Sequence, residues 1–122
     1  MTRRMGGRAL VCGVLTGAAV LLGACGSSGS GQATGATKSA CEQVSAVLSD
    51  GPDPGADPVG YAEAQILPLR QIKTADKNLE RAIDDLASAY QQFFRTKGGT
   101  VAKQAVSRAS AEVNAICPGA AS

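Results

Sequence analysis

The sequence of 122 residues contains no histidine and no tryptophan, and its aromatic residues are two tyrosines and two phenylalanines. Without histidine, the chain cannot form a Ser–His or Cys–His pair of the kind that activates a nucleophile. No glycine-rich loop follows a strand pattern, which excludes a phosphate-binding loop. The paired carboxylates Asp84 and Asp85 fall on the water-facing side of a helical pattern rather than in a cleft. We therefore expect no enzymatic activity and no cofactor.

The sequence also offers little to a metal ion or to a nucleic acid. The chain has no histidine and no second pair of thiols from which to build a zinc site. Asp50, Asp53 and Asp57 do not follow the spacing of a calcium-binding EF-hand loop, so we expect them to serve in turns and helix caps. The formal net charge of +2 depends on three arginines among the first eight residues. Without these arginines no clustered basic face remains, and we expect no nucleic-acid partner.

The N-terminal part combines a basic start with an apolar run that extends from Ala9 to Ala24. This run is short for a membrane-spanning helix, which needs about 20 apolar residues, and it fits the hydrophobic region of a signal peptide. The run ends in the sequence Leu-Gly-Ala-Cys at residues 22–25, which resembles a bacterial lipobox. The resemblance implies cleavage before Cys25 and attachment of a lipid to its sulfur. The alternative is an uncleaved signal anchor in which Cys25 is an ordinary residue.

The resemblance extends to small exported lipoproteins of high-GC Gram-positive bacteria, although the motif that carries it is confined to residues 1–25. It implies that the protein is anchored to the cell membrane on its extracytoplasmic face. Arg3 and Arg4 are also compatible with twin-arginine export, but Gly6 and Gly7 follow where such signals carry bulky apolar residues, which favours the general secretory route. No functional residue of the helical remainder follows from this resemblance.

The segment from Gly26 to Thr37 contains no large apolar side chain, so it predicts a flexible tether. We therefore divide the chain into a signal peptide (1–24), a lipidated tether (25–38), a helical bundle domain (39–118) and a short tail (119–122). Of the four cysteines, Cys12 leaves with the signal peptide and Cys25 receives the lipid. Cys41 and Cys117 remain as a pair in an oxidising compartment, which predicts a disulfide.

The mature part shows the start and stop signals of helices. Ser39 and Glu42 match a capping box, which predicts that a first helix begins at Ser39 and ends near Gly51. Asp57 followed by proline predicts the start of a second helical segment, which meets Pro68 and then resumes from Leu69 to about Thr96. The two glycines at positions 98 and 99 end this segment, and Thr100 is expected to cap a last helix over residues 101–116.

The long helical segment carries a heptad pattern, with apolar residues alternately three and four positions apart. The last helix carries a matching pattern, and alanines recur at every seventh position of both. Arg81 and Asp85 are spaced to form an ion pair on the exposed face. Because a two-glycine connection joins the two patterns, we expect these helices to be antiparallel neighbours. The long helix is predicted to contribute Ile72, Ala75, Leu79, Ala82, Leu86, Ala89 and Phe93, and the last helix Ala102, Val106, Ala109, Val113 and Ile116.

These elements predict an all-α fold, a small up-and-down bundle of three or four helices with one disulfide. The disulfide limits the arrangement, because the Cα atoms of Cys41 and Cys117 must lie within about 7 Å. If the chain reverses at Pro68, four helices alternate in direction and the two cysteines meet at one end. If Pro68 merely kinks a long helix, the first and last helices lie end to end along it. We favour the four-helix arrangement because it gives a more compact core.

Two functions are compatible with this fold. The first is a binding or structural interaction module that contacts another protein of the cell envelope, with Tyr61, Tyr90 and Phe94 as candidate contacts. The second is a carrier of a small or lipophilic ligand in a cavity of the bundle. The alanines let the long and last helices approach closely. We therefore expect any pocket to lie between residues 59–67 and the first helix.

Overall fold

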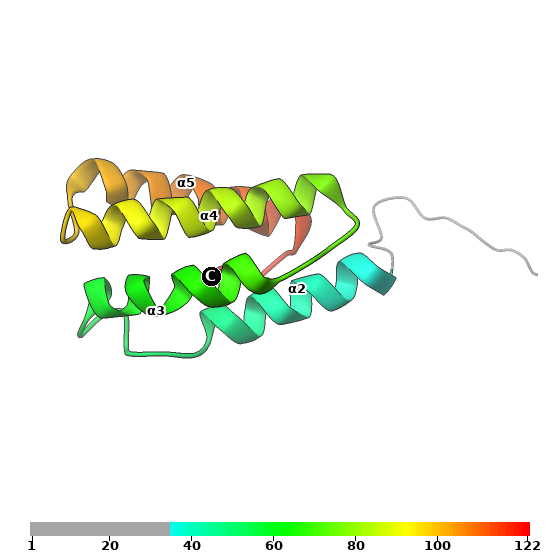
Figure 1. Ribbon diagram of the computed structural model, residues 1–122, viewed down its shortest axis with the longest axis horizontal. Coiled ribbons are helices and arrows are strands. Elements are labelled where there is room, and N and C mark those ends of the chain that lie inside the picture. Colours follow the sequence, from blue (N-terminus) through cyan, green and yellow to red (C-terminus); the bar gives the residue numbers. More distant parts are fainter. Residues whose placement is uncertain (1–34) are drawn as a thin grey trace, which may run out of the picture. The chain divides into compact units, whose positions relative to one another are not determined.

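The computed structural model describes residues 35–122, which form four helices that alternate in direction (Figure 1). They are α2 (Gly35–Leu48), α3 (Pro58–Gln71), α4 (Lys77–Arg95) and α5 (Thr100–Ile116). The described residues contain no strand. The all-α prediction is therefore confirmed, and of its two arrangements the four-helix bundle is the one observed.

The predictions for the signal peptide, the lipobox and Cys25 lie outside the described residues, as does most of the predicted tether. Among the described helices, none has the length and apolar character needed to cross a membrane.

The chain does not reverse at Pro68, which lies inside α3. The helix continues for three residues beyond the proline, and the chain turns between Ile72 and Asp76. The side chain of Asp76 accepts hydrogen bonds from the backbone N–H groups of Asn78 and Leu79, at 3.0 and 3.2 Å, and so caps α4. The predicted continuous helix from Leu69 to Thr96 is wrong, because this cap starts a new helix.

The heptad prediction is confirmed for most of α4, which packs closely against both α3 and α5. The first two residues of the predicted heptad pattern do not lie on α4. Ile72 is buried but belongs to the α3–α4 connection, and Ala75 in the same connection is exposed. On α5, Val106 and Ile116 are half-buried. The buried face of α4 consists of Leu79, Ala82, Ile83, Leu86, Ala87, Ala89 and Tyr90, and that of α5 of Ala102, Ala109 and Val113.

The start of α3 agrees with the sequence prediction. The Asp57 side chain accepts a hydrogen bond from the backbone N–H of Gly60 at 2.8 Å, and Pro58 occupies the first helical turn. Asp53 accepts hydrogen bonds from the N–H groups of Gly55 and Ala56, at 2.6 and 3.2 Å. These two aspartates therefore act in a turn and a helix cap, as predicted.

Two predicted caps are wrong. Helix α2 begins at Gly35, so Ser39 lies inside the helix, and residues 35–38 are its first turn rather than part of a tether. Thr37 is buried there and donates a hydrogen bond to Asp76 at 3.4 Å, which ties this first turn to the start of α4. Helix α5 includes Thr100, its N-cap is Gly99, and no side chain caps it.

The surface and the tail also differ from the sequence prediction. Arg81 and Asp85 do not form the predicted ion pair. The ion pairs found among residues 35–122 are Lys38–Glu42 and Lys77–Glu80. The C-terminal tail is held against α5, because the Asn114 side chain exchanges two hydrogen bonds with the backbone of Ala121, at 2.8 and 3.1 Å.

The predicted disulfide is present and joins the second turn of α2 to the residue that follows α5. The Cα atoms of Cys41 and Cys117 are 5.4 Å apart, and the bond closes a loop with a sequence separation of 76. Cys117 is buried beside Val113, so the link belongs to the core cluster. Helix α2 buries few residues of its own, namely Thr37, Ala40 and Val44. Its attachment therefore depends strongly on this bond.

We predict that replacing both cysteines (Cys41→Ala with Cys117→Ala) will lower the free energy of unfolding by about 4 kcal/mol, because the unfolded chain regains the entropy of a long loop. For a domain of this size the loss corresponds to a fall in Tm of roughly 15–30 °C, measurable by calorimetry or circular dichroism. The single variant Ser39→Ala, on the exposed face of the same helix, serves as the control. An unchanged melting curve for the double variant would contradict the prediction.

Candidate functional site

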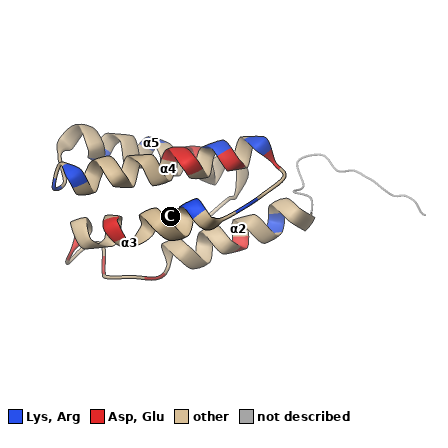
Figure 2. Cartoon of the chain, viewed as in Figure 1, with Lys and Arg blue, Asp and Glu red and all other residues tan. Residues whose placement is uncertain are grey.

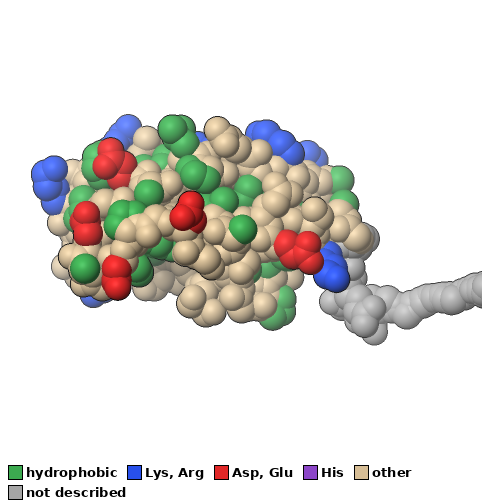
Figure 3. Space-filling view, turned by 90° about the horizontal axis from the view of Figure 1, so that it is seen from below, with side chains coloured by type: hydrophobic (Ala, Val, Ile, Leu, Met, Phe, Trp, Pro, Cys, Tyr) green, Lys and Arg blue, Asp and Glu red, His purple; other side chains and the backbone are tan. Residues whose placement is uncertain are grey.

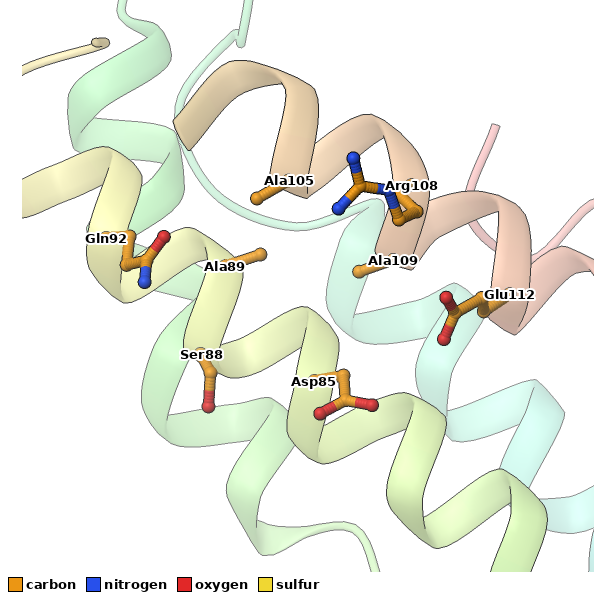
Figure 4. A pocket seen from close by; sticks show the side chains of 8 residues that line it. All are labelled: Asp85, Ser88, Ala89, Gln92, Ala105, Arg108, Ala109 and Glu112. Atoms are coloured by element: carbon orange, nitrogen blue, oxygen red, sulfur yellow. The ribbon is translucent and has the colours of Figure 1, made fainter. Parts of the chain in front are cut away.

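The described surface has several hollows, of which the one between α4 and α5 is lined mainly by polar side chains (Figure 4). Its volume is about 270 Å³, and small alanine side chains separate the two helices along it. Among the described residues, its charged side chains form no ion pair with one another. It is lined by Asp85, Ser88, Ala89 and Gln92 from α4 and by Ala105, Arg108, Ala109 and Glu112 from α5.

This polar groove is a weak candidate for a binding site. Asp85, Arg108 and Glu112 are exposed, and an ion pair in such a position contributes about 0–1 kcal/mol. The alanine floor offers little apolar area to a ligand. No deeply buried polar group points to a ligand here, so the groove by itself assigns no function.

A second hollow, of about 330 Å³, lies beside the disulfide. Helix α2 contributes Lys38, Glu42 and Ser45, and the other side is formed by Ile116 and the C-terminal tail. It is open, and its rim carries the Lys38–Glu42 pair, whose atoms are 4.0 Å apart.

The sequence predicted a pocket between residues 59–67 and the first helix, and a hollow of about 270 Å³ does lie between α2 and α3. Gln65 is 1% exposed there, and its amide nitrogen donates to the backbone oxygen of Asp50 at 2.8 Å. The amide oxygen of Gln65 has no hydrogen-bond partner among the described residues. One water molecule would satisfy that oxygen, and nothing else in the hollow indicates a larger ligand.

An almost wholly apolar hollow lies at the end of the bundle formed by the α2–α3 and α4–α5 connections, and we call it the aromatic pocket. Its volume is about 190 Å³. Three of the four aromatic residues in the whole sequence line it, although they come from two different helices. The lining residues are Pro54 and Pro58, Tyr61 of α3, Tyr90 and Phe93 of α4, and Val106 of α5.

Each aromatic ring of the pocket is held by a specific contact. The Tyr61 hydroxyl donates a hydrogen bond to the backbone oxygen of Leu48, the last residue of α2, at 2.7 Å. The rings of Tyr61 and Tyr90 meet edge to face, with centroids 5.8 Å apart, an arrangement that aromatic pairs favour. Phe93 lies against the α4–α5 turn, where a Cβ atom on Gly98 would approach its ring to 3.5 Å. Specific contacts therefore fix the positions of all three aromatic rings that line the pocket.

Both phenols of the pocket remain protonated at neutral pH. Burial raises the pKa of Tyr90 far above its ordinary value of 10.0, and the nearby Tyr61 raises it further. Burial also raises the pKa of Tyr61, an effect partly opposed by its hydrogen bond with Tyr90. The walls of the pocket are therefore uncharged.

Charge is unevenly distributed around this end of the bundle (Figure 2). The stretch 43–69, which includes the α2–α3 loop, contains four acidic residues and no lysine or arginine. The stretch 86–111, which includes the α4–α5 turn, contains four basic residues and no acidic one. From below, hydrophobic and acidic side chains lie together over the left part of the molecule (Figure 3). The acidic residues of the stretch 43–69 are Asp50, Asp53, Asp57 and Glu63. The basic residues of the stretch 86–111 are Arg95, Lys97, Lys103 and Arg108.

The structure brings together two of the three predicted contact residues. Tyr61 and Tyr90 face each other in the aromatic pocket, whereas Phe94 is half-buried outside its lining. Sequence reasoning missed Phe93 and Val106 as pocket residues, because it placed both on the helix–helix seam. Pro54 and Pro58 were also missed as pocket residues. They lie four residues apart and close to Tyr61, and this spacing was the sequence signal that could have indicated them.

No group of three or more acidic, cysteine or histidine side chains lies close enough to hold a metal ion within residues 35–122. Comparison of the chain with protein-family models, with curated proteins and with solved structures finds no match.

We predict that tyrosinate formation in the folded protein, followed by ultraviolet absorbance, will occur well above the pH at which the unfolded chain titrates, near the ordinary pKa of about 10. Because folding raises both phenol pKa values, the contribution of the two tyrosines to the free energy of unfolding is constant well below pH ~10 and falls as the pH rises through and above that value. The absence of tryptophan keeps the signal clean. Coincident titration curves for the folded and unfolded chains would contradict the prediction, and Tyr90→Phe assigns the more strongly shifted group.

Proposed function

We propose that this protein is a lipoprotein, anchored through Cys25 to the extracytoplasmic face of the cell membrane, and that it acts as an interaction module. In this proposal the aromatic pocket receives one apolar side chain of another envelope protein. The proposal rests on a single observation: a chain with four aromatic residues places three of them around one open, apolar hollow. Aromatic residues are enriched where proteins bind one another, because they bury a large area with few rotatable bonds.

The size of the pocket supports a side chain as its occupant. An engineered apolar cavity of about 150 Å³ accepts benzene, so a hollow of about 190 Å³ suits one aliphatic, proline or phenyl group. Ligand-binding cavities usually span about 300–1,000 Å³ and enclose most of the ligand. The hollow beside the disulfide reaches about 330 Å³ but is open to solvent. These volumes disfavour a carrier of a lipophilic ligand.

The direction of the chain supports the same function. Gly35, the start of α2, lies at the end of the bundle where α3 is connected to α4, whereas the α4–α5 turn, next to the aromatic pocket, lies at the other end (Figure 1). Helix α4 has 19 residues and is therefore about 28 Å long. Gly35, the first residue of α2, and the aromatic pocket thus lie at opposite ends of the bundle, so the start of the described chain does not cover the pocket.

We predict that cells fed an alkyne-tagged fatty acid will label the wild-type protein and not the variant Cys25→Ala, which is expected to leave the membrane fraction. Cys12→Ala is the matched control, because it removes the other cysteine of the N-terminal part and keeps the lipid-bearing sulfur. Labelling that persists in Cys25→Ala, or is lost in Cys12→Ala, would contradict the proposed anchor.

We predict that filling the pocket will abolish the interaction. A photoreactive residue at Thr100, exposed at the pocket end of α5, should capture one partner in intact cells. Val106→Phe, which fills the pocket from its wall, is expected to remove that adduct. Val101→Phe should retain it, because Val101 is on the same helix but 78% exposed and outside the lining.

Circular dichroism must show that both variants keep the wild-type helix content and a Tm close to that of the wild type. A photoreactive residue at Lys73, in the α3–α4 connection at the opposite end, tests whether capture is specific to the pocket. An adduct that survives Val106→Phe, or that forms equally from Lys73, would argue against docking at the aromatic pocket.

A further inference from the structure

We propose that the segment which fills the aromatic pocket is bipolar. It presents an apolar side chain to the pocket, a basic residue on the side of the α2–α3 loop, and an acidic residue on the side of the α4–α5 turn. The proposal rests on the proposed function, because it names the chemistry of the partner at the same site.

The acidic side of the pocket is formed by the loop before α3. Asp53 and Asp57 immediately precede Pro54 and Pro58, the two prolines that line the pocket. Both carboxylates are held in place, because Asp53 accepts hydrogen bonds from the loop backbone and Asp57 caps α3. Neither belongs to an ion pair among the described residues. Two fixed negative charges therefore adjoin the prolines, and neither is neutralised by an ion pair within residues 35–122.

The basic side is formed by the α4–α5 turn and the first turns of α5. Lys97 directly precedes Gly98, the residue against which the Phe93 ring packs. Lys103 lies three residues before Val106, so the two side chains emerge from the same face of α5. Neither lysine takes part in an ion pair among the described residues.

The two sides together favour a partner whose charges are separated. Opposite charges across an interface fix its orientation and speed encounter, and like charges placed together cost affinity. A segment with charges of one sign would be attracted at one side of the pocket and repelled at the other. A segment with a basic residue on one side of the apolar group and an acidic residue on the other is attracted at both sides of the pocket.

A second copy of this chain also has separated charges, but the available area disfavours it. With helices about 10 Å apart, the end of a four-helix bundle offers on the order of 400 Å². A stable interface usually needs about 800 Å² from each partner. A short extended segment, held by one apolar side chain and two charge contacts, matches the smaller area.

Synthetic peptides test the proposal against the full-length protein in nanodiscs of neutral phospholipid. The first peptide is Lys-Lys-Gly-Leu-Gly-Glu-Glu, and its binding is measured by calorimetry so that no aromatic label competes with leucine for the pocket. The second replaces leucine by serine, and two others keep leucine but carry charges of one sign. The bipolar leucine peptide is expected to bind about tenfold more tightly than each of the others, and its affinity should fall as salt is added.

Two double variants test the sides of the pocket separately. Asp53→Asn with Asp57→Asn removes the acidic charges and keeps the turn and the cap, because asparagine accepts the same hydrogen bonds. Lys97→Asn with Lys103→Gln removes the basic charges, and asparagine tolerates the positive φ of position 97. Each pair is expected to weaken the bipolar peptide about threefold to tenfold. Asp84→Asn and Lys73→Gln, exposed and outside the pocket lining, should have no effect.

The outcomes separate the two proposals. If the three leucine peptides bind equally and the serine peptide does not, the bipolar partner is wrong and the pocket remains a docking site. If leucine gives no advantage over serine, docking in the aromatic pocket is wrong as well. Unchanged binding to either double variant overturns the assignment of its side. If the chain instead self-associates through this end, so that Val106→Phe yields monomers, the occupant is a second copy and the bipolar segment is rejected.

Discussion

The arrangement of the molecule depends on the bond between Cys41 and Cys117. Helix α2 packs few residues into the core, and the disulfide joins it to the end of α5. The C-terminal end of α2 in turn lies beside α3, where the backbone oxygen of Leu48 accepts the hydrogen bond from Tyr61. The oxygen of Asp50 does the same for the buried amide of Gln65. The disulfide thus helps to position two side chains that are distant from it.

The core is filled mainly by small and aliphatic residues, while the aromatic residues gather at one end. Alanines on the facing sides of α4 and α5 let these helices approach closely without large side chains between them. Tyr90 is buried and belongs to the core cluster, and Tyr61 and Phe93 pack against that cluster. The same rings line an open, apolar hollow, which is why this end of the molecule is the candidate site.

Local sequence signals predicted helix starts well only where nothing competed with them. Asp57 and Pro58 determine the start of α3, because a cap and a proline at the first turn agree. Pro68 did not mark the point at which the chain reverses direction. A helix tolerates a proline near its C-terminal end when water can bind the backbone carbonyl that the proline leaves without a hydrogen bond. The cap at Asp76 decided the position of the turn. Ser39 and Glu42 matched a capping box by composition alone, and the burial of Thr37 extended α2 past them.

The aromatic pocket could be predicted only in part for the same reason. Tyr61 and Tyr90 were identified as residues of interest, but their contact depends on where the chain turns between α3 and α4. A shift of the turn by four residues, as from Pro68 to Ile72, rotates the following helix by about 40° relative to the preceding one. No local pattern determines that angle. The edge-to-face contact of Tyr61 with Tyr90 therefore emerges only from the assembled bundle.

The position of the disulfide has a mechanical consequence. Tension applied through the residues before Gly35 enters the bundle in the first turns of α2 and meets a covalent bond at Cys41. The load then passes directly to Cys117 and α5, so it bypasses most of the non-covalent packing between α2 and α3. A force applied from this side would unfold the first two turns of α2 at most, because the disulfide at Cys41 prevents the rest of the helix from separating from the bundle. A partner held at the opposite end would thus be connected to the start of the chain by a link that resists stretching.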